Sequence, residues 1–275
     1  QYEGFRLGVG GITNDRLSRR FGVGGYYAYG FRDVHSKYKA EGRYYISKNR
    51  DFFLAFSWGR DVFETGAAEI LIDRKPKQAE AIRNILIARM HQEERTEANL
   101  GFRWLKYITS TVFVRQTHAK ALFDYSFLTQ NKDKRYSWLE SGLSLRFAWG
   151  EQYYQSGNLK LSMGTQYPVL YGQICYGYDQ SGLGKANFLK ADIKAEKSFS
   201  YRRWGQSHIQ LLAGHVEGRV PLMRLYTGRS NLLQKDNLKV SSFNAFETML
   251  MNEITCNQYA ALFLQQDLGS FFRIK

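Results

Sequence analysis

The sequence predicts an all-β protein, an antiparallel up-and-down β-barrel that crosses a membrane with about twelve strands. Three observations indicate this class. Residues 187–200 alternate apolar and polar side chains, as a strand between an apolar and a watery phase would. The chain has 19 Tyr, 19 Phe, 5 Trp and 25 Gly but only 3 Pro, which favours strands. Mean hydropathy is negative and no run of about 18 apolar residues occurs, so no transmembrane helix is expected. A membrane-spanning strand does not need such a run, because its apolar residues alternate with polar ones.

The strand over 187–200 is the clearest single element. Its apolar face carries Leu189, Ala191, Ile193, Ala195 and Phe199. Its polar face carries Lys190, Asp192, Lys194, Glu196, Ser198 and Ser200. Such a strand is long enough to span a membrane, with lipid on one side and a wet lumen on the other.

Four candidate strands precede residue 60, at 3–13, 21–32, 36–46 and 52–59. The second places bulky residues on one face and glycine or alanine on the other, and the third places charges of both signs on one face. The fourth alternates aromatic or leucine side chains with a second set that is mostly small. All four therefore favour a wall with two different faces.

From residue 67 to residue 94 the period changes, because Ala, Glu, Gln, Ile, Leu and Arg dominate and glycine is absent after Gly66. Pro76 suits the first turn of a helix over roughly 77–92. A continuation of hairpin strands is the competing interpretation. Either way, 67–94 is expected to be a helical or irregular loop insertion into one domain that covers 1–275.

Strands then resume and close the chain. A charged loop, 130–135, and a long segment, 219–242, separate some of them. The expected strands are 95–104, 107–118, 137–149, 159–178 (bent or interrupted at Pro168), 187–201, 206–217, 243–255 and 259–272.

A water-soluble antiparallel sheet with one face on a core would show the same alternation. Two features favour the barrel: the strands are longer than sandwich strands usually are, and aromatic residues are enriched near strand ends, as in interfacial girdles. These aromatic residues are Tyr26, Tyr27, Tyr44, Tyr45, Trp104, Tyr107, Trp138 and Trp149.

The formal net charge of +14 suits polyanions or the phosphates of lipopolysaccharide and other lipid headgroups. Because the basic residues are dispersed, nucleic acid is not expected as a partner, which leaves membrane lipids, including lipopolysaccharide, as the expected one. Cys175 and Cys256 lack metal-ligand spacing, and a disulfide between them is left open. The glycine-rich stretches 8–11 and 22–25 lack the setting of a phosphate loop, so no cofactor is expected.

Charged residues on the polar faces are the candidate site. Their mixed signs favour cross-strand ion pairs that fill a narrow pore, with ion-selective permeation as the alternative. The expected lumen-facing charges are Lys39, Glu41, Arg43, Glu140, Arg146, Lys190, Asp192, Lys194 and Glu196.

An enzyme is not expected. Twelve-stranded outer-membrane phospholipases use a Ser-His-Asn set, but Ser207 and His208 are adjacent in a strand and would point to opposite faces. His118 and His215 would need cross-strand partners that sequence does not reveal. No catalytic or metal-binding residue is therefore proposed from the sequence.

Several segments in order resemble the barrel of a Bacteroidota-type outer-membrane family of unassigned function, whose members commonly carry a carboxypeptidase-regulatory-like domain ahead of the barrel. The first are Glu3-Gly-Phe-Arg-Leu-Gly8, Thr13-Asn-Asp-Arg-Leu-Ser-Arg-Arg-Phe21 and Gly24-Gly-Tyr-Tyr-Ala-Tyr-Gly-Phe-Arg-Asp33. The later ones are Arg74-Lys-Pro76, Gly150-Glu-Gln-Tyr-Tyr154, Tyr167-Pro-Val169, Gly218-Arg-Val-Pro221, Phe243-Asn-Ala-Phe-Glu-Thr-Met-Leu-Met-Asn-Glu253 and Tyr259-Ala-Ala-Leu-Phe-Leu264.

The resemblance implies a place in the bacterial outer membrane and a distant similarity to BamA/TamA surface-antigen barrels, which insert or translocate other outer-membrane proteins. Those factors usually carry an Arg-Gly-aromatic motif in a loop that enters the lumen, and Gly228-Arg229-Ser230 is a poor substitute. Family members also extend beyond both ends of the matching region, so the chain is expected to be a fragment. Assembly or export of outer-membrane proteins, a passive pore and a structural barrel are the functions left open.

Overall fold

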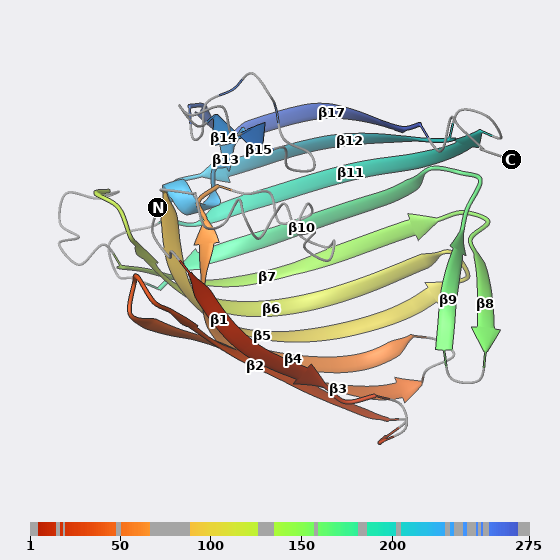
Figure 1. Cartoon of the computed structure of the whole chain (residues 1–275), viewed down its shortest axis with the longest axis horizontal. Coiled ribbons are helices and arrows are strands. Elements are labelled where there is room, and N and C mark those ends of the chain that lie inside the picture. Colours follow the sequence, from red (N-terminus) through yellow and green to blue (C-terminus); the bar gives the residue numbers. More distant parts are fainter. Residues whose placement is uncertain are drawn as a thin grey trace, which may run out of the picture.

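The structure is a computed structural model of the chain. It describes residues 5–14, 17–18, 20–47, 51–66, 89–125, 135–156, 159–180, 186–201, 205–228, 232–233, 239–240, 246, 249 and 253–268. Figure 1 shows one large curved antiparallel sheet. Its eleven strands, in spatial order, are β1 (Arg6–Ile12), β2 (Phe21–Gly30), β3 (His35–Ser47), β4 (Phe52–Glu64), β5 (Met90–Leu105), β6 (Ile108–Ala121), β7 (Arg135–Ala148), β10 (Val169–Asp179), β11 (Phe188–Tyr201), β12 (Gly205–Gly218) and β17 (Gln258–Asp267).

Each strand of this sheet pairs with the next one along the chain, so the all-β, antiparallel up-and-down class is confirmed. The sheet is not closed: among the described residues β1 and β17 are its two edges. A hairpin of β8 (Gln152–Ser156) and β9 (Leu159–Gly164) lies between β7 and β10 in the chain and crosses one end of the strands (Figure 1).

Between β12 and β17, the described residues form short elements. A 3-10 helix, η2, covers Leu222–Arg224. Two small antiparallel pairs accompany it: β13 (Tyr226–Thr227) with β16 (Thr255–Cys256), and β14 (Leu232–Leu233) with β15 (Lys239–Val240). No helix among the described residues has the length and apolar character needed to cross a membrane.

Two expectations about the strands are corrected and one is confirmed. The expected strand over 243–255 does not lie between β12 and β17, because β17 pairs directly with β12 from Gln206–Asp267 to His215–Gln258; most of 243–252 lies outside the described residues. Residues 90–94 belong to β5, where they pair with β4, so the expected insertion ends earlier; 67–88 lie outside the described residues. The interruption at Pro168 is confirmed, because β9 ends at Gly164 and β10 begins at Val169.

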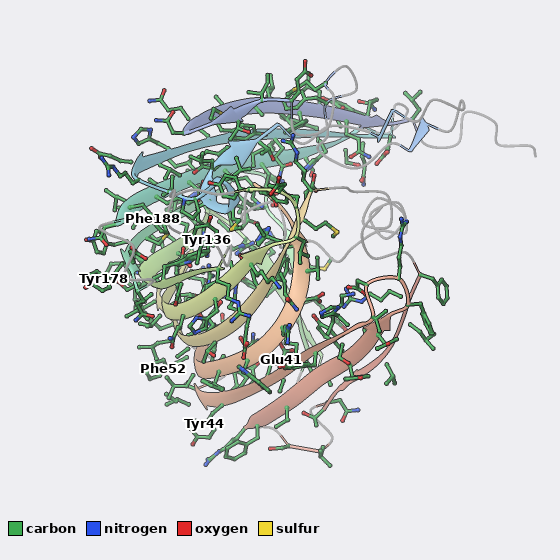
Figure 2. The ribbon with its side chains drawn as sticks, turned by 90° about the vertical axis from the view of Figure 1, so that its left-hand side faces the viewer. Glu41, Tyr44, Phe52, Tyr136, Tyr178 and Phe188 are labelled. Atoms are coloured by element: carbon green, nitrogen blue, oxygen red, sulfur yellow. The ribbon has the colours of Figure 1, made fainter. Side chains whose placement is uncertain are left out.

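The strand register gives the sheet two opposite faces, here named the concave face and the convex face. Figure 2 shows Glu41 inside the curve and Tyr44 and Phe52 on its outer side. The convex face is exposed and apolar: Ile193 is 61% and Leu211 52% exposed. Other exposed convex residues are Val23, Leu54, Phe56, Val114, Ile174, Leu262 and Leu264.

Polar residues bound the convex apolar surface along individual strands. On β12, Ile209, Leu211 and Ala213 lie between Ser207 and His215. On β17, which is the neighbouring strand, Leu262 and Leu264 lie between Gln258 and Gln266. The apolar residues therefore form a band, because side chains two apart share a face.

The core lies inside the curve, on the concave face. Tyr136, Trp138, Phe188 and Val216 from the sheet pack there with Val220, Met223 and Tyr226 from the segment that follows β12. The Tyr226 ring stacks at 5.8 Å on Tyr259 of β17. Residues from an irregular segment thus complete the core that the curved sheet leaves open.

Part of the expected aromatic girdle is wrong, because some of its residues lie on the concave face. Trp138 is 3% exposed within the core, and Tyr26 and Tyr45 lie on the concave side with Lys39 and Arg43. In contrast, Tyr27, Tyr44, Trp104 and Trp149 are exposed. Adjacent residues of one strand face opposite ways. Tyr26 and Tyr27 therefore cannot share a face, and neither can Tyr44 and Tyr45.

Candidate functional site

The candidate site is the charged concave face. The register places all nine sequence-predicted charges on it: Lys39, Glu41 and Arg43 on β3, Glu140 and Arg146 on β7, and Lys190, Asp192, Lys194 and Glu196 on β11. Their burial differs along the sheet. Lys190, Asp192 and Lys194 are each 4% exposed and Glu140 is 1% exposed. The side chains of Lys39 and Glu41, 43% and 40% exposed, are much more open.

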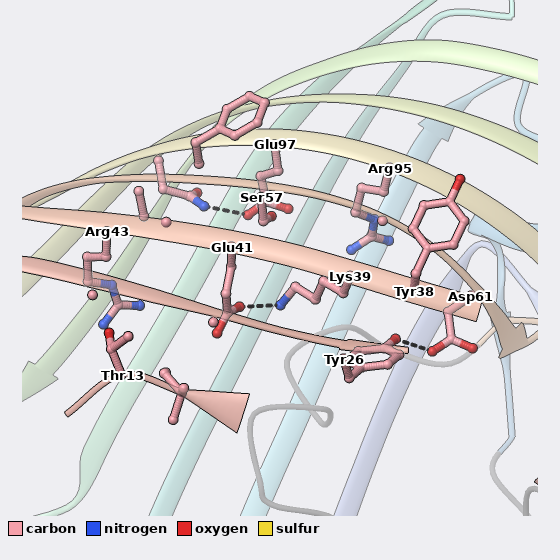
Figure 3. Close-up of a pocket in the computed structure, with 18 of the residues that line it drawn as sticks. Thr13, Tyr26, Tyr38, Lys39, Glu41, Arg43, Ser57, Asp61, Arg95 and Glu97 are labelled. Carbon is pink, nitrogen blue, oxygen red and sulfur yellow. Dashed lines mark hydrogen bonds and ion pairs between the residues drawn. The ribbon is translucent and has the colours of Figure 1, made fainter. Parts of the chain in front are cut away.

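The N-terminal strands line a cavity of about 890 Å³, shown in Figure 3. Ion pairs line it: Lys39 Nζ lies 2.7 Å from Glu41, and Arg6 contacts Asp61 through two bonds of 2.9 and 3.0 Å. Tyr26 donates a further hydrogen bond to Asp61. The cavity walls therefore hold charges that largely neutralise one another.

The sequence predicts cross-strand ion pairs, but several pairs run along a single strand. Lys39–Glu41, Lys190–Asp192 (4.0 Å) and Lys194–Glu196 (3.7 Å) each join residues two apart on one face. For the first two pairs glycine explains the difference, because Gly59 opposite Lys39, Gly24 opposite Glu41 and Gly214 opposite Asp192 carry no side chain. The residues opposite Lys194 are Tyr171 and Leu212, which are uncharged. A long lysine side chain then meets the nearest acid on its own strand.

Cross-strand pairs occur at the centre of the sheet. Arg115 of β6 lies between Glu97 of β5, at 2.8 Å, and Glu140 of β7, at 3.6 Å. Glu140 also accepts a hydrogen bond of 2.7 Å from Arg224, whose guanidinium lies 4.8 Å from the Trp138 ring centroid. Buried carboxylates are stable only when such partners offset their loss of hydration.

Arg224 belongs to an inserted segment, residues 219–228, that crosses the concave face. Tyr226 donates a hydrogen bond to Asp192, and Lys190 Nζ lies 4.7 Å from the centroid of the Tyr226 ring. The adjacent Gly214 makes room, since a Cβ there would lie 2.5 Å from the Tyr226 hydroxyl.

Two more contacts fix the ends of the inserted segment. The N–H of Thr227 donates to the carbonyl of Gly66, which follows β4, at 3.1 Å, and the N–H of Leu222 donates to the Tyr125 hydroxyl at 2.9 Å. Burial raises the pKa of Tyr125. The inserted segment thus joins the ends of β4, β6 and β12 across the inside of the curve.

Sequence reasoning missed Arg224 and Tyr226. The search for an Arg-Gly-aromatic motif turned to Gly228-Arg229-Ser230, of which Arg229 and Ser230 lie outside the described residues. The inserted arginine and aromatic side chain instead come from Arg224-Leu225-Tyr226. The only local signal is an arginine within an apolar run after Pro221, and that signal does not identify its partners.

Arg146 connects the concave face to the β8–β9 hairpin. Its guanidinium holds the carboxylate of Glu151 through two bonds of 2.7 and 2.6 Å, and Ser162 of β9 donates to the same carboxylate. Burial alone would raise the pKa of Glu151, but these donors and Tyr153 outweigh it and lower the pKa to about 2. The hairpin is therefore attached to the end of β7 by a charge cluster.

Histidine partners, which the sequence left open, are visible in the structure. His118 Nδ1 lies 2.9 Å from Ser137 Oγ on the convex face, and His208 Nδ1 lies 2.9 Å from Ser198 Oγ. Ser207 and His208 do point apart, since Ser207 donates to Gln266 instead. Among the described residues no three His, Cys, Asp or Glu side chains form a metal-binding group, and both cysteines are free thiols.

No protein-family model matches this chain, and no curated protein matches it either. The resemblance of Glu3–Asp33 and the later segments to an outer-membrane family thus gains no support from sequence comparison. The chemistry of the two faces carries the functional argument.

Proposed function

We propose that this chain forms the wall of a bacterial outer-membrane β-barrel that acts in the assembly or export of other outer-membrane proteins. One observation supports the membrane part above all: the exposed convex face is apolar, whereas Lys190, Asp192 and Glu140 are buried on the concave face. Water-soluble proteins have the reverse arrangement, with charges outside and apolar side chains inside. A sheet with lipid outside and a polar interior has the observed one.

Strand lengths support the same proposal. The longest strands, β5, β6, β7, β11 and β12, have 14 to 16 residues, and a tilted membrane strand needs about 9 to 11. The rings of Tyr107 and Trp149 lie 4.8 Å apart, and Trp104 is 65% exposed beside them. Such aromatic groups suit the boundary between lipid and water.

The connections between strands suggest an orientation. At one end, here named the long-loop end, the connections after β4, β6 and β12 cover 65–89, 122–134 and 219–257. At the opposite end, the short-turn end, the connections after β3, β5 and β11 cover only 48–51, 106–107 and 202–204, whereas the connection after β7, 149–168, is longer and contains the β8–β9 hairpin. Outer-membrane barrels have long extracellular loops and short periplasmic turns, so the long-loop end faces outward in this proposal.

Two features favour assembly or export over a wide passive pore. The inserted segment and its ion pairs fill part of the concave face over β6 to β12, and a cavity lies near β1 to β5. The edge strand β1 contains Gly8, Gly10 and Gly11 and pairs only with β2 in the sheet. An edge of this kind offers backbone groups to a further strand.

Replacement of Ile193 by Arg tests the membrane part. A charge at the lipid midplane is expected to cost about 2 to 4 kcal/mol of unfolding free energy, whereas in water an exposed position would tolerate it. The measurement is unfolding by urea after reconstitution in phospholipid vesicles. Leu17→Arg is the matched control, because Leu17 is 76% exposed but lies in the β1–β2 connection. Equal stability of the two variants would contradict a lipid-facing convex face.

Photocrosslinking at β1 tests the activity. A benzoylphenylalanine residue at Val9, on the exposed edge strand, is expected to capture newly made outer-membrane proteins in cells, and the same residue at Ile193 is not. Depletion of the protein is expected to lower the amounts of other outer-membrane barrels. Normal amounts after depletion, with no crosslinks at Val9, would leave a structural barrel as the better interpretation.

A further inference from the structure

A polar patch interrupts the convex face at the long-loop end of β6, β7 and β10, and it is here named the rim patch. Its residues are Gln116, His118, Lys120, Arg135, Ser137 and Gln180. The register pairs His118 with Ser137 and Lys120 with Arg135, so these four side chains share one small area. Exposed apolar residues, including Val114 and Leu139, continue from the patch along the same strands.

Lys120 and Arg135 are cations directly opposite each other on neighbouring strands. Like charges in that position repel and destabilise the pair of strands. Lys120 has no ion-pair partner among the described residues, and the nearest carboxylate in register on this face, Glu94, is opposite both His118 and Arg60. An anion between the two cations would remove their repulsion.

The donor and the acceptor of each hydrogen bond in the rim patch can be assigned. The Gln116 amide nitrogen donates to Gln180 Oε1 and to His118 Nε2, each at 3.3 Å. The neutral imidazole then carries its proton on Nδ1 and donates to Ser137 Oγ at 2.9 Å. The Ser137 hydroxyl therefore has its own hydrogen to donate, beside Lys120 and Arg135.

We propose that the rim patch binds a phosphate group of a lipopolysaccharide-type lipid in the outward-facing leaflet. Lys120, Arg135 and Ser137 supply donors to the phosphate oxygens, and the apolar band below the patch contacts the acyl chains. The inference rests on the proposed function, because it requires the convex face to lie in the membrane with the long-loop end outward.

The test uses the full chain in phosphatidylcholine nanodiscs, titrated with bisphosphorylated lipid A and analysed by native mass spectrometry. The double variant Lys120→Ala, Arg135→Ala is expected to lower the affinity about tenfold or more, since each basic residue near a membrane surface contributes roughly 1 kcal/mol. Ser137→Ala is expected to lower it by a smaller factor. Lys106→Ala is the matched control, because Lys106 is an exposed cation at the short-turn end.

The outcomes separate the two proposals. Wild-type protein that does not insert into lipid would contradict the proposed function itself. Wild-type protein that inserts but binds lipid A no better than phosphatidylcholine would overturn only the phosphate site. Unchanged affinity in the double variant, or an equal loss in Lys106→Ala, would overturn it as well, since binding would then reflect overall positive charge. Heat-modifiable migration on gels checks that each variant is folded.

Discussion

At the scale of single residues, Glu140 is a fully buried charge of the concave face with two guanidinium partners. It is 1% exposed and accepts contacts from Arg224 at 2.7 Å and Arg115 at 3.6 Å. Removal of one member of a buried ionic group leaves the others without compensation in a place that water does not reach. The arrangement is thus more sensitive to loss of a single charge than an exposed ion pair is.

Replacement of Glu140 by Gln is expected to cost about 3 to 5 kcal/mol of unfolding free energy, because two guanidinium groups then lack their shared carboxylate. The same change at Glu41, whose pair with Lys39 is exposed, is expected to cost about 1 kcal/mol or less. Urea unfolding in lipid measures both. A double variant with Arg224→Met is expected to recover part of the loss, and strictly additive effects would argue against the contact.

At the scale of elements, the carboxylate of Glu151 is a main attachment of the β8–β9 hairpin, together with the hydrogen bond from Arg103 to Tyr153. Because the pKa of Glu151 is lowered to about 2, its contribution to stability is complete above the ordinary carboxyl pKa, which is about 4.3. The contribution falls as the pH decreases from there to about 2, where the folded protein also takes up the proton. Acid is therefore expected to loosen the hairpin over this pH range.

Hydrogen exchange of the β8 and β9 amides tests this, once the measured rates are corrected for the intrinsic pH dependence of exchange. Protection is expected to fall between pH 4.3 and about pH 2 in the wild-type protein. Glu151→Gln is expected to show low protection at every pH in this range, with little effect on the β11 amides. A hairpin in the variant that keeps wild-type protection would show that Glu151 does not hold it.

At the scale of the whole molecule, a curved sheet and an irregular segment share the interior. The sheet supplies charges from β3 to β11, and the inserted segment, residues 219–228, supplies Arg224 and Tyr226, which contact β7 and β11. The large cavity lies away from that segment, along β1 to β5. We therefore expect the inserted segment to reduce any flow of ions along the concave face.

Conductance in planar bilayers tests this division. The wild-type chain is expected to conduct weakly, because the inserted segment fills part of the concave face over β6 to β12. The double variant Arg224→Ala, Tyr226→Ala removes its contacts with Glu140 and Asp192 and is expected to conduct more. Tyr154→Ala, an exposed change on the hairpin, is the control. A wild-type conductance as large as that of the double variant would favour the passive pore.

The sequence by itself determined which side chains share a face. The period of a strand is two, so Ile193 and Lys194 must point to opposite sides wherever the strand lies. All nine expected charges accordingly lie on one face, and eleven of the twelve expected strands are present in the sheet. Adjacency in the chain also determined the order of strands, because antiparallel neighbours need only short connections.

Only the tertiary structure decided what meets across that face. Arg224 and Glu140 are 84 residues apart in the chain, and nothing local to either residue encodes their contact. The tertiary structure also decided that Trp138 lies in the core and that glycines direct lysines along their own strand. It likewise decided that β12 pairs directly with β17, past residues 243–255. Each depends on how the sheet curves and on which distant segment fills the curve, and a local pattern of period two carries neither.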